Sequence, residues 1–299
     1  MNVLEGPRRE FRRVLVNGSE TTGEMHGEVL RLADGREFDP AAVTHLPPCQ
    51  PSKIICVHLN YASRYFEFNG RSLAAGSRLT PTYFLKPSTS LNAHGGEVVR
   101  PDGHQYLNYE GEVAAVIGRP TRNIQPDEVW DHLAGFSCAL DMGLHDMRDT
   151  DAGSMMRVKG ADTLCPVGPG LVTGVDIREQ TLRTYRNGVV VQEAPLSELI
   201  WGIDYLVADV ARHITLLPGD MILSGTPANS RPLEVGDSIE LEVSGLGRLS
   251  SRVVAAPAAR ASIGHHPTDS DEVRRVALGN DDRLPSALRD ANSRARRRA

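Results

Sequence analysis

The chain has 299 residues, of which 33 are Lys or Arg and 38 are Asp or Glu, and its formal net charge is −5. This balance excludes the strongly basic surface of a protein whose main partner is nucleic acid. No run of about 18 apolar residues is present, and the N-terminal stretch lacks an apolar core of signal-peptide length, so we expect a cytoplasmic protein without a membrane span. The cysteines form no CxxC pair, which predicts free thiols at Cys49, Cys56, Cys138 and Cys165.

The first unit along the chain is predicted to be a small β-rich lobe over residues 1–50. Its alternating segments, FRRVLVNG and GEVLRLADGREF, are separated by Gly and Asp turns, a pattern typical of short strands. Residues 51–255 form the second and largest unit, in which strand-like runs alternate with loops. The clearest runs are KIICVHL, TYFLKP, EGEVAAVIG, GFSCALDMG, CPVGPGLVTG, LRTYRNGVVVQ and SIELEVSGLGRLSSRVV.

Helices are predicted at only two places in this unit. QPDEVWDHLAG, residues 125–135, has acidic residues in its first turn and Gly near its end, and LSELIWGIDYLVADVARHIT, residues 196–215, has helical apolar spacing with Pro218 beyond it. The Asn-Gly pair of RNGVV predicts a tight hairpin turn. Strands outnumber helices and are unevenly spaced, which favours a β-rich α+β fold with a mixed sheet over a doubly wound sheet.

The last unit, residues 256–299, differs in composition. It is rich in Ala, Ser, Asp and Arg and poor in large apolar residues, so we expect a polar, flexible tail or a loosely attached helix. Its terminal RARRRA is a candidate contact for an anionic surface, although a solvated chain end is the favoured interpretation.

Two glutamates, Glu110 and Glu112, stand two positions apart in the strand-like stretch LNYEGEVAAVIGR. Residues i and i+2 of a strand point to the same face, and Ala114 and Val116 continue that face as a buried one. Burying either carboxylate alone is costly. Three arrangements resolve the conflict: one carboxyl group is protonated, basic side chains neutralise both, or a divalent cation binds them.

Further candidates follow at strand ends and turns. Asp141 comes directly after the apolar run GFSCAL and would complete a triad of carboxylates with the two glutamates. Lys159 is one of three lysines in a chain dominated by arginine, and it is either an acid–base group beside the metal or a salt-bridge partner. The turn LSGTPANS, Leu223 to Ser230, offers small hydroxyls and amides to a substrate carboxylate.

These motifs together resemble the fumarylacetoacetate hydrolase family over roughly residues 50–255. The resemblance is closest to the branch of 2-hydroxyhepta-2,4-diene-1,7-dioate isomerases, which is related to the homoprotocatechuate-pathway isomerase/decarboxylase. It rests on segments that occur in the family's order: ICVHLNYASRYFEF, TYFLKPSTSLNAHGG, NYEGEVAAVIGR, ALDMGLHD, KGADTLCPVGPGLVT, PGDMILSGTPANS and VGDSIELEVSGLGRLSSRV.

The resemblance implies a catalytic domain with a mixed β-sheet roll, a homodimer, and small 2-oxo or 2-hydroxy acids as substrates. It also implies a Mg²⁺ or Mn²⁺ ion whose ligands fall on Glu110, Glu112 and Asp141. Lys159 matches the family's active-site lysine. The residues expected to contact the substrate are Arg64, Tyr61, Lys86 and Thr226.

Two departures from the family pattern concern acid–base groups. Hydrolytic members carry N-Y-x-x-H-x-x-E, a His–Glu dyad on a mobile lid, but here Arg64 takes the histidine position before Glu67. An arginine is not a useful base near neutral pH. His145 stands where the family has the Arg of its ARD motif. Its candidate roles are a substrate contact, an acid–base group and a structural loop histidine. His58 is a further candidate.

The missing dyad favours isomerisation over hydrolysis. Hydrolytic C–C cleavage needs an activated water, whereas keto–enol isomerisation or decarboxylation needs an electron sink, which a metal beside the 2-oxo acid provides. We therefore predict a metal-dependent isomerase, or isomerase/decarboxylase, of a 2-hydroxy-dienoate or 2-oxo-enoate diacid from aromatic catabolism. The alternatives are a hydrolase of acylpyruvate or fumarylacetoacetate-like diketo acids, in which Glu67 acts with His58 or His145, and a non-catalytic metal-binding protein.

Overall fold

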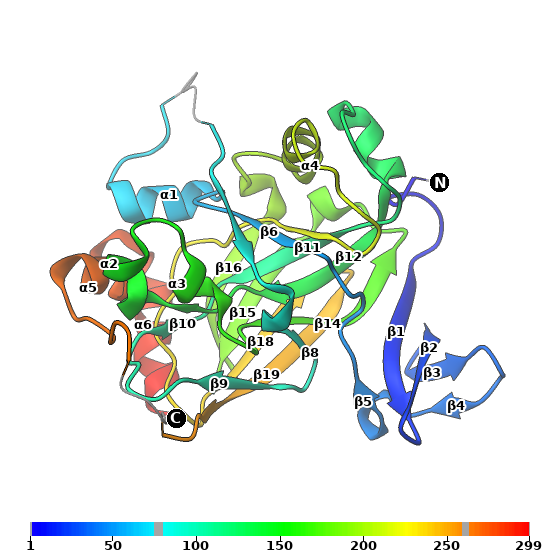
Figure 1. The fold of residues 1–299 in the computed structure, drawn as a ribbon, viewed down its shortest axis with the longest axis horizontal. Helices are drawn as coiled ribbons and strands as arrows, with labels where there is room; N and C mark the ends of the chain where they lie inside the picture. Colours follow the sequence, from blue (N-terminus) through cyan, green and yellow to red (C-terminus); the bar gives the residue numbers. More distant parts are fainter. Residues whose placement is uncertain (1, 75–79, 259–262, 299) are drawn as a thin grey trace.

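The computed structural model describes residues 2–74, 80–258 and 263–298. Two sheets dominate the described residues, and the helices lie around them (Figure 1). The larger sheet has 12 strands, and ten of them follow one path: β4 (Glu37–Phe38), β3 (Val29–Leu32), β2 (Ser19–His26), β1 (Arg9–Val16), β14 (Cys165–Thr173), β12 (Leu133–Leu140), β11 (Gly111–Ile117), β17 (Met221–Leu223), β6 (Ile54–Val57) and β7 (Tyr83–Lys86). The other two, β5 (Thr44–His45) and β8 (Leu91–Ala93), pair with β1 and β14.

A smaller sheet packs against the larger one. Its order is β16 (Val189–Pro195), β15 (Thr181–Arg186), β18 (Ser238–Val243), β19 (Gly247–Ala255) and β9 (Glu97–Arg100), and a separate pair joins β10 (Leu107–Asn108) to β13 (Gly143–Leu144). Strands β11, β12 and β14 contact β15, β18 and β19. The apolar residues between the two sheets form the main core, which explains why every residue of β11 is buried. The mixed, β-rich fold predicted from the sequence is therefore confirmed.

The Asn-Gly hairpin is formed as predicted. Asn187 and Gly188 connect β15 to β16 with φ of 52° and 72°, the left-handed values that a two-residue hairpin turn requires. The predicted helix over 125–135 is instead a short 3₁₀ helix, Pro126–Asp131, and the region 196–215 divides into the 3₁₀ helix Leu196–Glu198 and α4 (Ile203–Ala211). Gly202 interrupts this second region because its backbone is extended.

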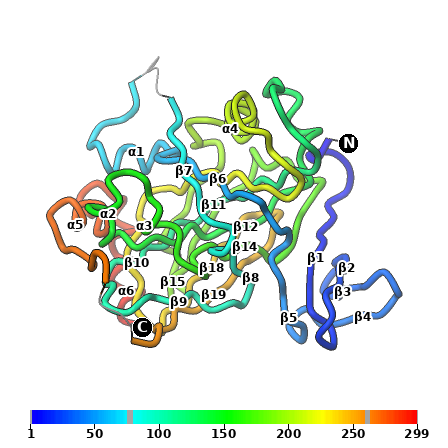
Figure 2. Tube along the Cα trace, in the orientation of Figure 1, coloured from blue at the N-terminus to red at the C-terminus, as the bar shows by residue number. Residues whose placement is uncertain are grey.

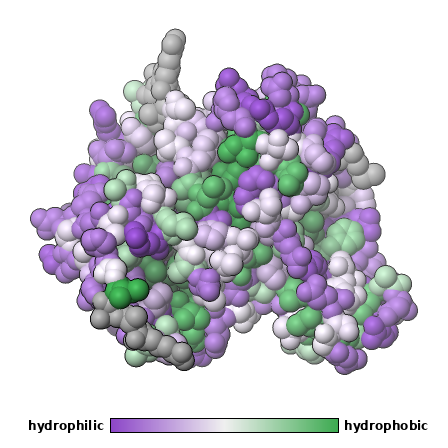
Figure 3. All heavy atoms as spheres, in the orientation of Figure 1, coloured by the Kyte–Doolittle hydropathy of each residue, from purple (hydrophilic) through white to green (hydrophobic). Residues whose placement is uncertain are grey.

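The described residues contain five further α-helices: α1 (Ala62–Asn69), α2 (Arg148–Asp151), α3 (Met156–Gly160), α5 (Asp271–Leu278) and α6 (Ser286–Arg296). The remaining 3₁₀ helices are Pro40–Ala42, Ser88–Ser90, His145–Met147, Ile177–Glu179 and Asp281–Arg283. Polar residues cover much of the face in Figure 3, and apolar residues gather between α1 and α4. None of the described helices is long and apolar enough to span a membrane.

The N-terminal strands have a small core of their own. Val14, Val16, Leu30 and Leu32 form a cluster apart from the main core. The lobe is nevertheless continuous with the large sheet, because β1 pairs antiparallel with β14.

Of the two alternatives expected for the last unit, a flexible tail or a loosely attached helix, the structure has helices over residues 263–298. Two helices, α5 and α6, pack onto the body, with α5 beside α2 (Figure 2). Their buried residues are mostly small or of medium size: Val273, Val276 and Ala277 in α5, and Ala291, Asn292 and Ala295 in α6. The low apolar content that suggested disorder is enough to attach these helices to the body, because the buried residues recur at helical spacing on one narrow face of each helix.

Candidate active site

The antiparallel register of β11 and β12 brings two of the predicted metal ligands together. Gly111 pairs with Leu140, and one position further the amide of Asp141 donates a hydrogen bond of 2.8 Å to the carbonyl of Glu110. Two residues after Glu110, Glu112 of β11 pairs with Ala139 of β12. The strand end and the i, i+2 spacing thus place all three carboxylates at one edge of the sheet.

The three carboxylates form a compact cluster of oxygen ligands. One carboxylate oxygen from each of Glu110, Glu112 and Asp141 lies within 4.8 Å of the other two. Glu112 and Asp141 are each 1% exposed, and Glu110 is partly exposed toward the neighbouring cavity.

Two lysines neutralise part of this negative charge. The Nζ of Lys159 lies 2.6 Å from Glu110 Oε2 and 2.9 Å from Asp141 Oδ2, and the Nζ of Lys86 lies 2.7 Å from Asp141 Oδ1. Gly143 makes room for the first lysine, because a Cβ there would lie 3.1 Å from its Cε. Glu112 has no cation beside it among the described residues and accepts a 2.8 Å hydrogen bond from the amide of Gly225.

The pKa values of the cluster follow this unequal pairing. Burial raises the pKa of Glu112 well above its usual range, and the charges of Asp141 and Glu110 add to the rise. Burial also opposes the charge of Glu110, but Lys159 and two further basic groups hold its pKa well below the usual range. Burial lowers the pKa of Lys159, yet the two carboxylates beside it outweigh burial and raise that pKa. Positive charge is therefore missing mainly at Glu112.

This donor set fits a hard divalent cation. Mg²⁺ and Mn²⁺ favour carboxylate oxygens, and Mg²⁺ is commonly held by a few carboxylates together with water and substrate oxygens. A cation at Glu110, Glu112 and Asp141 would also compensate the carboxylate that no lysine reaches. The metal predicted from the sequence is thus consistent with the geometry of these residues.

A cavity of about 370 Å³ opens beside the carboxylates. Its walls include most of the predicted site residues, namely Arg64, Glu110, Glu112, His145, Lys159 and Thr226. His58, Phe68 and Phe84 contribute further to the lining. A cavity of this size accommodates a small organic acid.

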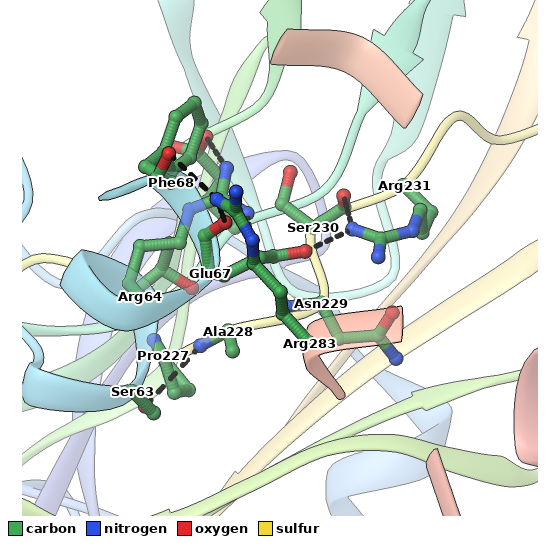
Figure 4. A network of polar contacts seen from close by, with 12 residues as sticks. Ser63, Arg64, Glu67, Phe68, Pro227, Ala228, Asn229, Ser230, Arg231 and Arg283 are labelled. Atoms are coloured by element: carbon green, nitrogen blue, oxygen red, sulfur yellow. Dashed lines mark hydrogen bonds and ion pairs between the residues drawn. The ribbon is translucent and has the colours of Figure 1, made fainter. Parts of the chain in front are cut away.

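Arg64 lies in α1 and is 3% exposed. Its Nη1 donates a 2.7 Å hydrogen bond to Glu67 Oε2, and its Nη2 is 3.6 Å from Glu110 Oε1. The other oxygen of Glu67, Oε1, lies 2.7 Å from Nη1 of Arg231 (Figure 4). Oε2 also accepts a 3.1 Å hydrogen bond from the amide of Asn229. Both oxygens of Glu67 are therefore occupied.

His145 is 2% exposed, and neither of its ring nitrogens has a hydrogen-bond partner among the described residues. Its Nε2 is 3.8 Å from Glu110 Oε1. Burial lowers the pKa of His145 despite this carboxylate, so the imidazole is neutral near pH 7. His58 also lines the cavity, and its Nδ1 lies 3.3 Å from the carbonyl of Thr82.

Thr226 belongs to the turn that follows β17. Gly225 needs its left-handed φ of 87°, and a Cβ there would lie 2.8 Å from Asn60 Cβ. The Nε2 of Gln192 donates a 3.1 Å hydrogen bond to Thr226 Oγ1. The turn thus presents a fixed hydroxyl to the cavity, at the position where a substrate carboxylate was predicted.

Two of the predicted substrate contacts lie elsewhere. Tyr61 is fully buried, its hydroxyl has no hydrogen-bond partner among the described residues, and it is not part of the cavity wall. Lys86 is 1% exposed and contacts Asp141 and the carbonyl of Met142 instead of the cavity. It neutralises Asp141, one of the predicted metal ligands, because β7 directs its ammonium group to that carboxylate.

Sequence reasoning missed several residues of the cavity wall. Arg148, which follows the predicted site residue His145 by three positions, lines the cavity with Met155. Arg275 and Val276 come from α5, within the segment expected to be a flexible tail. The only available signal for α5 was Ser270 before Asp271 and Glu272, since Ser270 Oγ accepts a hydrogen bond from the amide of Val273 and caps the helix.

Comparison with known proteins assigns the chain to a family. The sequence profile for the C-terminal domain of fumarylacetoacetate (FAA) hydrolase matches residues 53–254. A protein of Mycobacterium tuberculosis is 38% identical over 223 residues, which cover 74% of this chain and 82% of that protein.

Some relatives have names that state an activity. The 4-hydroxyphenylacetate degradation bifunctional isomerase/decarboxylase of Escherichia coli is 34% identical over 232 residues, covering 77% of this chain. The alignment covers 53% of that enzyme, so the chain spans about half of its length. The crystal structure of 5-carboxymethyl-2-hydroxymuconate delta-isomerase from Mycobacterium smegmatis has a TM-score of 0.77 and 32% identity, covering 83% of this chain and 99% of that chain.

Proposed function

Because the chain belongs to the fumarylacetoacetate hydrolase family, we propose that it is a divalent-metal-dependent isomerase, or isomerase/decarboxylase. Its substrate in this proposal is a 2-hydroxy-dienoate or 2-oxo-enoate diacid from aromatic-compound catabolism. The names of the Escherichia coli and Mycobacterium smegmatis relatives support this class of reaction.

The state of Glu67 is the observation that carries the choice of isomerase over hydrolase. A hydrolytic dyad needs a glutamate that is free to orient a histidine, and a histidine beside it. Here Glu67 is bound on both oxygens by Arg64 and Arg231. This arrangement supports a reaction that needs no activated water.

A Mg²⁺ or Mn²⁺ ion at the three carboxylates would supply the positive charge that stabilises negative charge developing on the oxygens of a 2-oxo acid. The chain's own residues would move the proton. Lys159, held charged by Glu110 and Asp141, would stabilise negative charge developing on the substrate with its ammonium group. His145, a neutral imidazole in a buried part of the wall, suits proton transfer at a ring nitrogen.

Two further residues would hold the substrate's ends. The hydroxyl and turn amides around Thr226 suit the carboxylate next to the 2-oxo group. Arg64 suits a carboxylate elsewhere on the substrate, because a guanidinium matches carboxylate geometry. A homodimer, predicted from the family resemblance, is part of the same proposal, and sedimentation of a single monomeric species at micromolar concentration would contradict it.

Loss of the dienol ultraviolet absorbance of a 2-hydroxy-2,4-dienedioate, measured with Mg²⁺ or Mn²⁺ present, tests the reaction. Lys159→Met should lower kcat by about 10²–10³-fold, the usual contribution of one group that stabilises a developing negative charge. Lys53→Met is the matched control, because Lys53 lies outside the cavity and pairs with Asp220; it should lower stability and leave kcat unchanged.

Product analysis separates the proposal from its strongest rival. Isomerisation conserves the mass of the substrate, and decarboxylation removes only CO₂. Hydrolysis would instead yield two acids, and that outcome would exclude the proposed isomerase. The rival is kept because His145 is a buried, neutral base 3.8 Å from a metal-ligand carboxylate.

A further inference from the structure

The C-terminal segment, residues 268–283, lies across the side of the cavity formed by α1 and α2, and it follows the end of the family match at residue 254. It contains α5 and the 3₁₀ helix Asp281–Arg283. Two of its residues, Arg275 and Val276, form part of the cavity wall. A segment outside the family's shared domain therefore completes the site.

The start and middle of the segment are attached to the loops that carry site residues. The amide of Thr268 donates a 2.8 Å hydrogen bond to the carbonyl of Asp146, directly after His145. The hydroxyl of Tyr106 donates a 2.7 Å bond to Asp269. In the middle, the carbonyl of Ala277 accepts a 2.8 Å bond from Asn108, close to the metal-ligand strand in sequence.

The end of the segment is attached to α1. Arg283 Nη1 donates hydrogen bonds of 2.8 Å to the carbonyl of Glu67 and 3.0 Å to that of Phe68, which are free carbonyls of the helix's last turn. Figure 4 shows Arg283 beside these residues. Asp281 lies 2.9 Å from Arg231, the second partner of Glu67. The segment thus fixes the helix that carries Arg64.

Two arginines meet on one aromatic ring of the cavity wall. The guanidinium carbon of Arg64 lies 4.6 Å from the centre of the Phe68 ring, and that of Arg275 lies 5.7 Å from it. A third arginine, Arg148, lines the same cavity, and its only hydrogen-bond contact among the described residues is the sulfur of Met155 at 4.0 Å. Three guanidinium groups therefore line one cavity, and one of them, Arg148, makes no ion pair within 4.0 Å among the described residues.

Arg275 has an exposed ion-pair partner that a substrate carboxylate can replace. Glu272 binds it at 2.7 and 2.8 Å, but their side chains are 50% and 55% exposed. Exposed ion pairs of this kind contribute little to stability, so a carboxylate in the cavity can replace Glu272. Arg64, in contrast, is buried, with its Nη1 held by Glu67 and its Nη2 3.6 Å from Glu110, so it lies beside the carboxylate cluster.

We propose that Arg275 of the C-terminal segment, together with Arg148, selects substrates that carry a second carboxylate. The inference rests on the proposed function, because it assumes that the first carboxylate and the 2-oxo group bind at the carboxylate cluster. Val276 and the contacts of Arg283 hold the selecting arginine and α1 at the cavity wall. Arg275 is thus a specificity-determining residue supplied from outside the family domain.

Binding of a matched pair of 2-oxo acids to the Mn²⁺-loaded full chain tests this inference. 2-Oxohexanedioate and 2-oxohexanoate differ only in the terminal carboxylate, and isothermal titration calorimetry measures both. The wild-type chain should bind the diacid about tenfold more tightly, as a charge-assisted bidentate contact predicts. Arg275→Gln should remove this preference and leave affinity for the monoacid unchanged.

Three further variants sharpen the test. Glu272→Gln frees Arg275 and should increase the preference for the diacid. Arg289→Gln in α6 removes an exposed arginine that does not line the cavity, and it should leave both affinities as in the wild type. Arg283→Gln should speed hydrogen exchange of the amides of residues 62–69, because it releases the end of α1.

The outcomes separate the two proposals. If the wild-type chain prefers the diacid and Arg275→Gln keeps that preference, the inference is overturned while the proposed function stands. If the wild-type chain binds neither acid in the presence of Mn²⁺, the proposed function fails and the inference fails with it. Retained thermal unfolding of Arg275→Gln at the wild-type temperature excludes misfolding as the cause of a lost preference.

Discussion

Single side chains in the carboxylate cluster differ in how their charge is balanced. Glu110 and Asp141 each have a lysine within 2.9 Å, whereas Glu112 has only an amide of the Gly225 turn. A buried carboxylate without a cation is unfavourable, because few interactions replace its hydration. The site is therefore built with a deficit of positive charge, which is what a cation-binding site needs.

Glu112→Gln tests this imbalance. The substitution removes a ligand and an uncompensated charge, so the metal-free protein should be as stable as the wild type or more so. Stabilisation by Mn²⁺, which grows as RT ln(1 + [L]/Kd), should disappear. Thermal unfolding with and without Mn²⁺ measures both effects.

Glu97→Gln serves as the control for that substitution. Glu97 begins β9 in the smaller sheet and is exposed, so its metal-dependent stabilisation should equal that of the wild type. A Glu112→Gln protein that gains as much stability from Mn²⁺ as the wild type would contradict the assignment of Glu112 as a ligand.

Among the elements, α1 is held in place by buried charged side chains. Its residues Arg64 and Glu67 are both buried, and Arg231 from the loop after β17 completes an Arg–Glu–Arg group. Burial alone would raise the pKa of Glu67, but the charges of the two arginines lower it below its ordinary value of 4.5. The carboxylate therefore remains charged at neutral pH and holds α1 against the loop.

Glu67→Gln should destabilise the protein by about 3 kcal/mol, because it removes the anion that two buried guanidinium groups share. A depressed pKa contributes stability that is present above the ordinary value of 4.5 and is lost as the pH falls below it. The wild type should thus lose more stability than Glu67→Gln between pH 7 and acid pH. Urea unfolding at several pH values measures the difference, and equal acid sensitivity of the two proteins would contradict this role.

At the scale of the whole molecule, the C-terminal helices share the body's packing. Asn292 of α6 and Asn229 exchange hydrogen bonds of 2.8 and 3.0 Å, and both are buried. A second link joins the carbonyl of Ala295 to Asn187 of the hairpin at 3.2 Å. These contacts predict that the helices unfold together with the body.

Asn292→Ala should lower the free energy of unfolding by about 2 kcal/mol, because the buried side chain of Asn229 loses the two hydrogen bonds that it exchanges with Asn292. The transition should remain single, as expected of a shared core. Ser293→Ala, at the next and exposed position, should change stability little. Circular dichroism during urea unfolding measures both, and a separate early transition for the helices would show that they are not part of the body's fold.

The local patterns of the chain determined much of the strand content and the shared face of Glu110 and Glu112. A strand's period of two is encoded within a few residues, so alternation and the position of Asp141 after an apolar run are readable without tertiary contacts. The Asn-Gly turn is local in the same sense, since it depends on the φ values of two residues.

Tertiary structure decided what surrounds the carboxylates. The register of β11 against β12, the approach of Lys86 from β7 and the docking of α5 join segments far apart in the chain. Such contacts depend on how the whole chain packs, and no short stretch of sequence encodes them. For this reason a weakly apolar segment could be mistaken for a flexible tail, although in the folded protein its Arg275 and Val276 line the cavity beside the carboxylate cluster.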